Sequence, residues 1–359
     1  MSKIMSNFAR FEKNIENNMK ILVTGAAGFI GSRLAYMLAK RGDDVIGIDS
    51  INDYYDVRLK YGRLRDCGYL IANDELPFGQ VVQNDLFSNM RFIRMSIEDK
   101  QSLDQLFETE HFDVVVNLAA QAGVRYSITH PYTYMQSNLV GFLNILEACR
   151  HFAVRKLVFA SSSSVYGMNE KVPYSEEDKV DTPVSLYAAS KKSNELMAHC
   201  YAKLYGIQCI GLRFFTVYGP WGRPDMSPML FANALRDNQP IKVFNNGDMI
   251  RDFTYIDDIV EGTIHTIDKD IPAEKWDNGV PYRIYNIGCS NPVKLMDFIH
   301  ELESAYGKEA EKVYLPMQPG DVYQTNADTT RLESEMGYKP HWKLVEGIRE
   351  FVEWYKHHM

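Results

Sequence analysis

The residues most able to do chemistry are a tyrosine and a lysine in the middle of the chain. Tyr187 and Lys191 are spaced so that, on a helix, both lie on one face. Tyrosine has an ordinary pKa of about 10 and is a poor base at neutral pH. Positive charges close to the ring favour the phenolate. We therefore predict that Tyr187 is a general base and that Lys191 assists it.

A run of serines precedes this pair. Ser161, Ser162, Ser163 and Ser164 directly follow the apolar stretch 156–160. Serine-rich loops are common, so the run alone predicts little. Together with Tyr187, however, a hydroxyl at this place favours hydrogen bonding to a ligand. The pair Tyr36 and Lys40 has the same spacing without such a run, and we assign that pair to packing and solvent.

Three glycines form a second candidate site near the start of the chain. Gly25, Gly28 and Gly31 follow the apolar run 21–23 and open a segment with helical spacing at 29–41. This arrangement lets a pyrophosphate approach the backbone at a helix N-terminus, where free N–H groups favour anions. Asp49 ends the next apolar run, where a carboxylate accepts hydrogen bonds from ribose hydroxyls and repels a 2′-phosphate. The sequence therefore predicts a dinucleotide site that prefers NAD to NADP.

The elements around these residues alternate between short apolar runs and helical patterns. Such alternation predicts an α/β fold with a Rossmann-type, doubly wound parallel sheet. We expect a leader of unknown role at 1–18, an NAD-binding domain at 19–215 that also receives about 241–265, and a smaller C-terminal α/β lobe for the substrate at 216–359. A helix is expected at 291–306. The predicted strands lie at 21–23, 45–48, 114–116, 156–160 and 207–212.

Composition narrows the class of protein. The 359 residues carry a formal net charge of −8, which does not favour nucleic acid. The sequence has no apolar run long enough to span a membrane. Its five cysteines are an odd number without a CxxC pair, so we expect reduced thiols in a cytoplasmic protein and no metal.

Longer motifs resemble those of the extended short-chain dehydrogenase/reductase family, and within it they are most similar to UDP-glucuronate 4-epimerases. The strings that carry the resemblance are NDYYDV at 52–57 with Leu59 and Lys60 after it, AAQAGVRYS at 119–127 and RFFTVYGPWGRPDM at 213–226. The similarity covers nearly the whole chain from Met19. It implies a homodimer that pairs through helices such as the one carrying Tyr187.

The resemblance also implies roles for single residues. Ser162 would join Tyr187 and Lys191 as the catalytic hydroxyl, with Ser163 as the alternative in the repetitive run. One departure is Ser96, which stands where many relatives have Asp. The residues implied to bind NAD are Gly25, Gly28, Phe29, Ile30, Gly31, Asp49, Ile97, Asn117, Ala119, Ala120, Tyr187 and Lys191.

The substrate implied by the resemblance is a UDP-sugar. Thr216 replaces the Asn that is usual in UDP-galactose 4-epimerases, and with Ser163 and Ser164 it could bind a hexuronate carboxylate. Arg251 is the implied ligand of the nucleotide diphosphate. Arg125 and Arg223 are either further ligands or surface ion pairs.

The expected reaction is NAD-dependent 4-epimerisation of UDP-glucuronate to UDP-galacturonate through a transient 4-keto sugar. Related 4,6-dehydratases usually have Asp-Glu in place of Ser163-Ser164, and related UDP-glucuronate decarboxylases have Glu at the second position. The alternatives are a 4-epimerase of UDP-glucose or UDP-N-acetylglucosamine, a decarboxylase or dehydratase, and an NAD-binding sensor or scaffold without activity.

Overall fold

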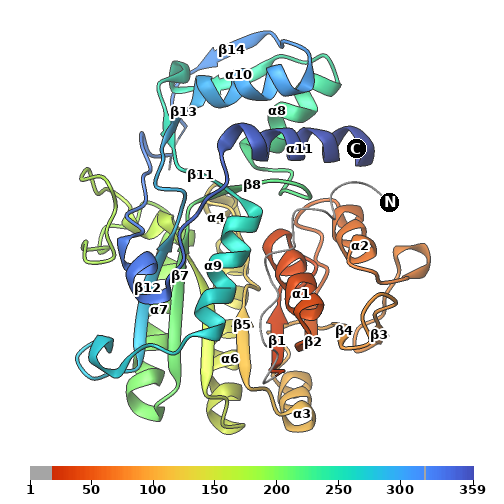
Figure 1. The fold of residues 1–359 in the computed structure, drawn as a ribbon, viewed down its shortest axis with the longest axis vertical. Coiled ribbons are helices and arrows are strands. Elements are labelled where there is room, and N and C mark those ends of the chain that lie inside the picture. The colour runs from red at the N-terminus through yellow and green to blue at the C-terminus, as the bar shows by residue number, and fades with distance from the viewer. Residues whose placement is uncertain (1–17, 319–320) are drawn as a thin grey trace.

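The computed structural model describes residues 18–318 and 321–359, so residues 1–17 of the predicted leader lie outside the described part. The lower half of Figure 1 is an eight-stranded sheet in the order β12-β7-β6-β5-β1-β2-β4-β3. Neighbouring strands are parallel except for β3 and β4. The order runs outward from β1 in both directions, so the predicted doubly wound sheet is confirmed. Its strands are β1 (Lys20–Thr24), β2 (Asp44–Asp49), β3 (Val81–Gln83), β4 (Met90–Arg94), β5 (Val114–Asn117), β6 (Lys156–Ser162), β7 (Gln208–Phe214) and β12 (Tyr282–Ile287).

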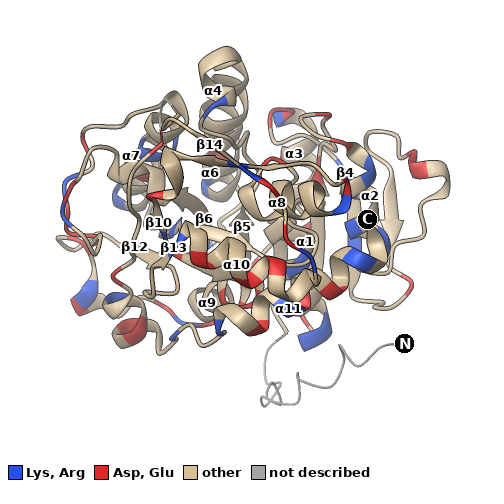
Figure 2. Cartoon of the chain, turned by 90° about the horizontal axis from the view of Figure 1, so that it is seen from above, with Lys and Arg blue, Asp and Glu red and all other residues tan. Residues whose placement is uncertain are grey.

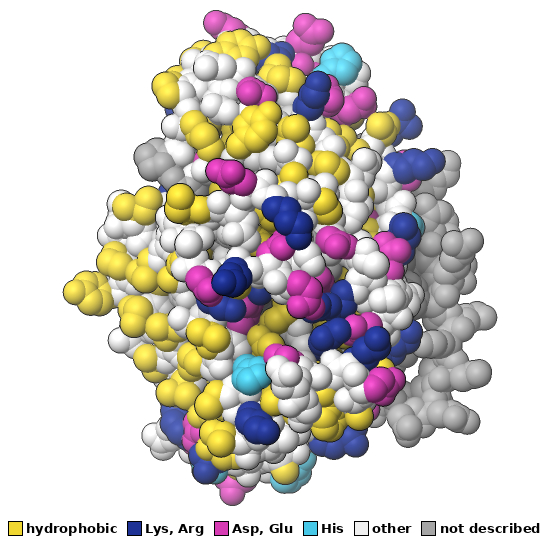
Figure 3. Space-filling view, turned by 90° about the vertical axis from the view of Figure 1, so that its left-hand side faces the viewer, with side chains coloured by type: hydrophobic (Ala, Val, Ile, Leu, Met, Phe, Trp, Pro, Cys, Tyr) yellow, Lys and Arg dark blue, Asp and Glu magenta, His cyan; other side chains and the backbone are white. Residues whose placement is uncertain are grey.

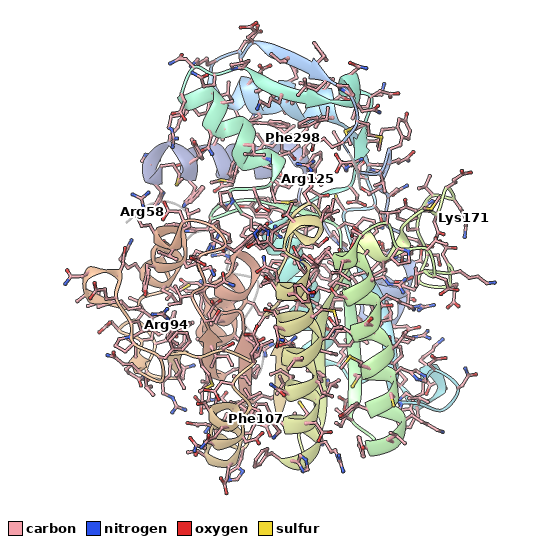
Figure 4. The ribbon with its side chains drawn as sticks, turned by 180° about the vertical axis from the view of Figure 1, so that it is seen from behind. Arg58, Arg94, Phe107, Arg125, Lys171 and Phe298 are labelled. Atoms are coloured by element: carbon pink, nitrogen blue, oxygen red, sulfur yellow. The ribbon has the colours of Figure 1, made fainter. Side chains whose placement is uncertain are left out.

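Helices cover both faces of this sheet, and each face has its own apolar core. Leu34 and Ile259 belong to the core under α1 (Phe29–Arg41) and α9 (Ile256–Asp268). Leu103 and Leu146 belong to the core under α3 (Lys100–Glu110), α6 (Gly141–His151) and α7 (Leu186–Tyr205). These last three helices are in front when the molecule is seen from behind (Figure 4). Because both faces are covered, the central strands are continuous apolar runs, as β5 illustrates with every residue buried.

The helix that carries Tyr187 has clear start and stop signals. The Ser185 side chain accepts a hydrogen bond from the Ala188 N–H at 3.1 Å, which caps the first turn of α7. Gly206 ends the helix with a φ of 71°, a left-handed conformation that glycine adopts without strain. These two caps fix which turn of α7 faces the end of β6.

The second lobe lies above the sheet in Figure 1 and is built around three helices and three short strand pairs. Figure 2, which looks down on this lobe, marks acidic residues on α10 and residues of both charges on α11. The helices of this lobe are α8 (Ser227–Arg236), α10 (Leu295–Tyr306) and α11 (Leu344–His358). The helix predicted at 291–306 is α10, which begins at Leu295. The strand pairs are β8 (Thr216–Tyr218) with β11 (Phe253–Tyr255), β9 (Ile241–Phe244) with β14 (Lys312–Leu315) and β10 (Ile250–Arg251) with β13 (Val293–Lys294).

The chain crosses between the two parts more than once. Of the segment 241–265, β9 pairs with β14 in the upper lobe, whereas α9 packs against α1 on the large sheet. Residues 282–287 form β12, which pairs with β7 at the edge of the large sheet. The domain boundary predicted at 216 assigns this strand to the second lobe. The strand was not recognised in the sequence because Arg283 and Asn286 interrupt the apolar run that is typical of a buried parallel strand. Among the described residues, no helix combines the length and the apolar character that crossing a bilayer requires.

Candidate active site

A cavity of about 1020 Å³ lies beyond the carboxyl ends of β1, β2, β5, β6 and β7 and continues beneath the second lobe. Parallel α/β sheets bind ligands at this edge. Every predicted site residue except Asn117 lines the cavity. These are Gly25, Gly28, Phe29, Ile30, Gly31, Asp49, Ile97, Ala119, Ala120, Arg125, Ser162, Ser163, Ser164, Tyr187, Lys191, Thr216, Arg223 and Arg251.

Asn117 lies beneath the cavity wall. Its side-chain oxygen accepts a hydrogen bond from the Thr24 hydroxyl at 2.7 Å, and that hydroxyl accepts one from the Ala119 N–H at 3.0 Å. Asn117 is therefore not among the residues that line the cavity, and its contact with Thr24 helps to hold the backbone at Ala119, which does line it.

The glycine turn has the shape that a diphosphate needs. Gly25 has a φ of 72°, and its carbonyl accepts a hydrogen bond from the Gly28 N–H at 2.8 Å. A Cβ on Gly31 would lie 2.1 Å from the Gly25 oxygen, and a Cβ on Gly28 would lie 2.9 Å from it. The turn therefore closes against the first turn of α1, whose free N–H groups are available to an anion.

The carboxylate of Asp49 is fixed at the next strand end. One oxygen accepts from the Ile51 N–H at 2.8 Å and the other from the Ala27 N–H at 3.2 Å, which ties Asp49 to the glycine turn. Lys60, a buried cavity residue, lies 3.9 Å from Asp49 and donates to the Asn52 amide oxygen at 2.7 Å. Asp49 and the turn together suit the adenosine end of a dinucleotide. Lys60 was not predicted as a site residue, although Leu59 and Lys60 belong to the motif that begins at Asn52.

The catalytic candidates meet where β6 ends and α7 begins. Tyr187 and Lys191 lie on α7, and Ser162 is the last residue of β6. The Lys191 ammonium group donates to the Ala160 carbonyl at 2.8 Å, and burial lowers the pKa of Lys191 to about 8. Burial raises the pKa of Tyr187, while a hydrogen bond with Ser162 and the charge of Arg223 oppose that rise. Tyr187 and Lys191 thus lie one helical turn apart on α7, and both line the cavity together with Ser162.

The serine run divides by strand register. The Ser161 hydroxyl points away from Tyr187 and donates to the buried Glu195 carboxylate at 2.6 Å. Ser162 faces Tyr187, and its oxygen accepts from the Ser164 hydroxyl at 2.9 Å and from the Ser164 N–H at 3.2 Å. Ser163 and Ser164 begin the short 3₁₀ helix η4 (Ser163–Tyr166) at the cavity wall. Of the two serines left open by the sequence, Ser162 is the one whose hydroxyl lowers the pKa of Tyr187, and both serines line the cavity.

The three predicted arginines differ in how they are held. The Arg251 guanidinium donates hydrogen bonds to the carbonyls of Ile250, Val322 and Tyr323 at 2.6 to 2.9 Å. Burial lowers the pKa of Arg251. Arg125, labelled between the two lobes in Figure 4, forms an ion pair with Asp321 at 3.2 Å.

Arg223 pairs with Asp225, and its Nε lies 3.1 Å from the Asp225 carboxylate. Figure 3 shows basic and acidic side chains gathered across the middle of the face, between the lower domain and the second lobe. The cavity therefore offers cations to an anionic ligand, but two of the three already have a carboxylate partner.

Thr216 begins β8 at the far wall of the cavity. Its N–H donates to the Asp252 carbonyl at 3.2 Å, and the residue lines the same cavity as Ser163 and Ser164. Further cavity residues that the sequence did not single out are Tyr54, Lys60, Asp225 and Asp321. Tyr54 and Asp225 stand within the quoted strings at 52–57 and 213–226, so those strings were the available signal.

Comparison with known proteins places these features in context. Residues 21–288 match the model of the NAD dependent epimerase/dehydratase family. Protein CapI of Staphylococcus aureus is 49% identical over 346 residues, which cover 94% of this chain and 98% of that protein. A probable UDP-glucuronate 4-epimerase of Rhizobium meliloti (strain 1021) is 42% identical over 347 residues, covering 94% and 97%. The crystal structure of UDP-glucuronic acid 4-epimerase from Bacillus cereus with UDP-glucuronic acid and NAD superposes with a TM-score of 0.82 at 35% identity, covering 94% and 99%.

Proposed function

Because the chain belongs to the NAD dependent epimerase/dehydratase family, we propose that it is an NAD-dependent UDP-sugar 4-epimerase that acts on UDP-glucuronate. The observation that carries the proposal is the meeting of Ser162, Tyr187 and Lys191 in the cavity that also contains the glycine turn. The cofactor is NAD, for which Asp49 and the close-packed glycines fit the adenosine and diphosphate ends. The product of the proposed reaction is UDP-galacturonate.

Tyr187 moves the proton in the proposed reaction. NAD, when bound, supplies reversible removal and return of the hydrogen at sugar C4, so the reaction has no net redox change. The Tyr187 phenolate takes the proton of the sugar 4-hydroxyl, and the Ser162 hydroxyl orients that oxygen by hydrogen bonding. In the proposed reaction the Lys191 cation favours the phenolate from one helical turn away, and its ammonium group is held in the cavity by the Ala160 carbonyl. After the 4-keto sugar has rotated in the cavity, the hydrogen would return to C4 on the opposite face, and Tyr187 gives the proton back to the C4 oxygen.

The serine run favours epimerisation over the neighbouring reactions. Dehydration needs an acid that protonates the leaving hydroxyl, and Ser163 and Ser164 occupy the positions where such an acid would stand. A serine hydroxyl cannot do this work at neutral pH. The same positions carry no Glu that would mark a decarboxylase. We therefore rank the dehydratase, the decarboxylase and the NAD-binding scaffold behind the epimerase.

The proposed reaction is tested with a panel of substrates. Purified protein is incubated separately with UDP-glucuronate, UDP-glucose and UDP-N-acetylglucosamine, without added NADH, and products are followed by NMR. We expect UDP-galacturonate from the first and little turnover of the others. Conversion of the neutral sugars alone would contradict the uronate claim, release of carbon dioxide would indicate a decarboxylase, and tight NAD binding without any turnover would indicate a scaffold.

Thr216 provides a prediction on substrate choice. Thr216→Val keeps the shape of the side chain but removes a hydroxyl that could donate to the hexuronate carboxylate. A hydrogen bond to a charged group contributes about 1.5–3 kcal/mol, so we expect the preference for UDP-glucuronate over UDP-glucose, measured as a ratio of kcat/KM, to fall by about tenfold or more. Thr129→Val, in the short helix α4 (Tyr126–Thr129), is the matched control. An unchanged ratio in Thr216→Val would remove Thr216 from carboxylate recognition.

Arg223 provides a prediction on pH. Burial raises the pKa of Tyr187, Ser162 and Arg223 lower it, and Asp225 raises it. Arg223→Gln removes a lowering charge and leaves the raising one, so the phenolate forms only at higher pH. We expect the acid limb of the kcat–pH profile to move to higher pH, whereas Arg125→Gln leaves the limb in place. A fall in kcat without movement of the acid limb would show that Arg223 does not act on the base.

The protein is further proposed to be a homodimer. Three apolar side chains lie exposed on the outer side of neighbouring helices, with Leu143 of α6 40% exposed and Leu196 and Leu204 of α7 61% and 63% exposed. Leu196 and Leu204 are two helical turns apart, so they form one stripe. Light scattering on the purified protein tests the dimer, and a monomeric mass at all concentrations would contradict it.

A further inference from the structure

The segment from Trp221 to Asp225, here called the arm, leaves the second lobe and rests on α2 (Val57–Asp66) of the lower domain. In Figure 1, α2 lies below the C-terminal end of α11, on the side that faces the second lobe. The Trp221 indole N–H donates to Asp66 at 3.1 Å. Its ring lies so close to Gly62 that a Cβ there would meet ring carbons at 2.5 and 2.6 Å. Trp221 also has a φ of 62°, a left-handed conformation that a bulky residue keeps only where its surroundings hold it.

Arg63 fastens the arm to the cofactor side. Its side chain is 1% exposed, and its acceptors are carbonyl and hydroxyl oxygens. The guanidinium donates to the Trp221 carbonyl at 2.9 and 3.0 Å, to the Ala27 carbonyl at 3.2 Å and to the Tyr55 hydroxyl at 2.6 Å. Ala27 belongs to the glycine turn. One buried cation therefore joins the diphosphate-binding turn, the loop after β2 and the arm, with the fork geometry that arginine alone provides.

The far end of the arm is held from the same loop. The Tyr54 hydroxyl donates to Asp225 at 3.0 Å, and Asp225 in turn pairs with Arg223. The Tyr54 ring packs edge-on against Tyr126, with ring centroids 4.7 Å apart, which fixes where its hydroxyl points. Arg223 and Asp225 both act electrostatically on Tyr187, in opposite directions. Because Arg223, Asp225 and Tyr187 line the same cavity, a shift of the arm would change the distances of both charges from Tyr187.

We propose that Tyr54, Gly62, Arg63 and Asp66 form a clasp that holds the arm where Arg223 faces Tyr187, so that these four are positioning residues for the proton transfer. The inference rests on the proposed epimerase function for its effect on rate. The clasp itself depends only on contacts within the protein. Because Arg63 also binds the glycine turn, the same contacts link the cofactor side of the cavity to the substrate side.

Two variants test the clasp at opposite ends. Gly62→Ala lies outside the cavity lining and pushes the Trp221 ring away, although an alanine at this helical position would otherwise favour the helix. Tyr54→Phe keeps the aromatic packing and removes the bond to Asp225. Arg58→Ala, on the exposed side of α2, is the matched control. For each protein we would measure kcat, KM, the thermal midpoint and amide hydrogen exchange in peptides that cover the arm.

We expect kcat to fall about tenfold in Gly62→Ala and in Tyr54→Phe with little change in KM, as for loss of a hydrogen bond to a charged group that acts in the transition state. Exchange should rise in the arm and stay unchanged in α7, while Arg58→Ala behaves as wild type. Tyr54→Phe combined with Asp225→Asn should be no slower than Asp225→Asn alone, because both remove one contact.

Two results would contradict the clasp proposal, and a third would contradict the proposed epimerase function. Unchanged exchange in the arm of both variants would show that the clasp does not hold it, and the proposal would be wrong. Faster exchange with a wild-type kcat would show that the arm does not govern the base, which also overturns the proposal. A wild-type protein without turnover on any UDP-sugar would overturn the proposed function instead, and the exchange comparison would still decide whether the clasp holds the arm.

Discussion

Tyr187→Phe lowers kcat by about 10²–10⁴-fold, the usual contribution of a positioned general base, and leaves NAD bound. The variant loses only the hydroxyl that takes the substrate proton, while the ring keeps its edge-on contact with Tyr134 at 6.1 Å between centroids. The substitution leaves the Tyr187 ring buried and the bond from Lys191 to the Ala160 carbonyl in place, so we expect the binding of cofactor and substrate to change little. Single-turnover kinetics and the NAD content of the purified protein measure the two halves of this result.

The chain contains its own control for this experiment. Tyr36 has the same spacing to a lysine, but it lies on α1 and packs against Phe87 with ring centroids 5.4 Å apart. Tyr36→Phe should therefore keep wild-type kcat. If Tyr187→Phe retained wild-type turnover, Tyr187 would not be the base, and loss of NAD together with activity would mean that the ring instead supports the cofactor site.

We expect Gly31→Ala to weaken NAD binding. The added Cβ would lie 2.1 Å from the Gly25 oxygen and 2.8 Å from the Gly25 carbonyl carbon, so the turn that faces the diphosphate must open. Overpacking of this kind costs about 1–3 kcal/mol, which corresponds to a loss of about 10- to 100-fold in NAD affinity if the strain is relieved at the turn. Titration calorimetry with NAD on cofactor-free protein measures the affinity directly.

A general effect of replacing glycine is excluded by Gly206→Ala. Gly206 has a φ of 71° at the end of α7, and its Cβ position is open, so alanine there strains only the backbone. That variant should bind NAD as the wild type does, with a small loss of thermal stability. Wild-type NAD affinity in Gly31→Ala would mean that the diphosphate does not rest on this turn.

The sequence predicts the cofactor half of the site well because its geometry is local. A strand, a glycine turn and a helix follow one another directly, so the spacing of Gly25, Gly28 and Gly31 already determines the backbone that surrounds a diphosphate. Asp49 is found for the same reason, since the next parallel strand ends at the same edge. For Asn117, spacing locates the end of β5 but cannot say whether the side chain faces the cavity or the Thr24 hydroxyl that it contacts in the structure.

Other features depend on contacts that local patterns do not contain. Tyr54 and Asp225 are 171 positions apart, and Arg63 and Trp221 are 158 apart, so no periodicity connects them. The serine run leaves its catalytic member open, because four identical residues do not reveal which one the register of β6 turns towards Tyr187. The edge strand β12 escaped prediction because Arg283, which pairs with Glu335, breaks its apolar pattern.

The most direct test of the central claim follows the hydrogen at C4 of the substrate. Purified protein without added cofactor is incubated with UDP-glucuronate deuterated at C4, and the product is examined by NMR and mass spectrometry. The proposed mechanism predicts UDP-galacturonate that retains the deuterium at C4, because the same hydrogen leaves and returns within one closed cavity. Product that has lost the label to water, or release of carbon dioxide in place of an epimer, would contradict it.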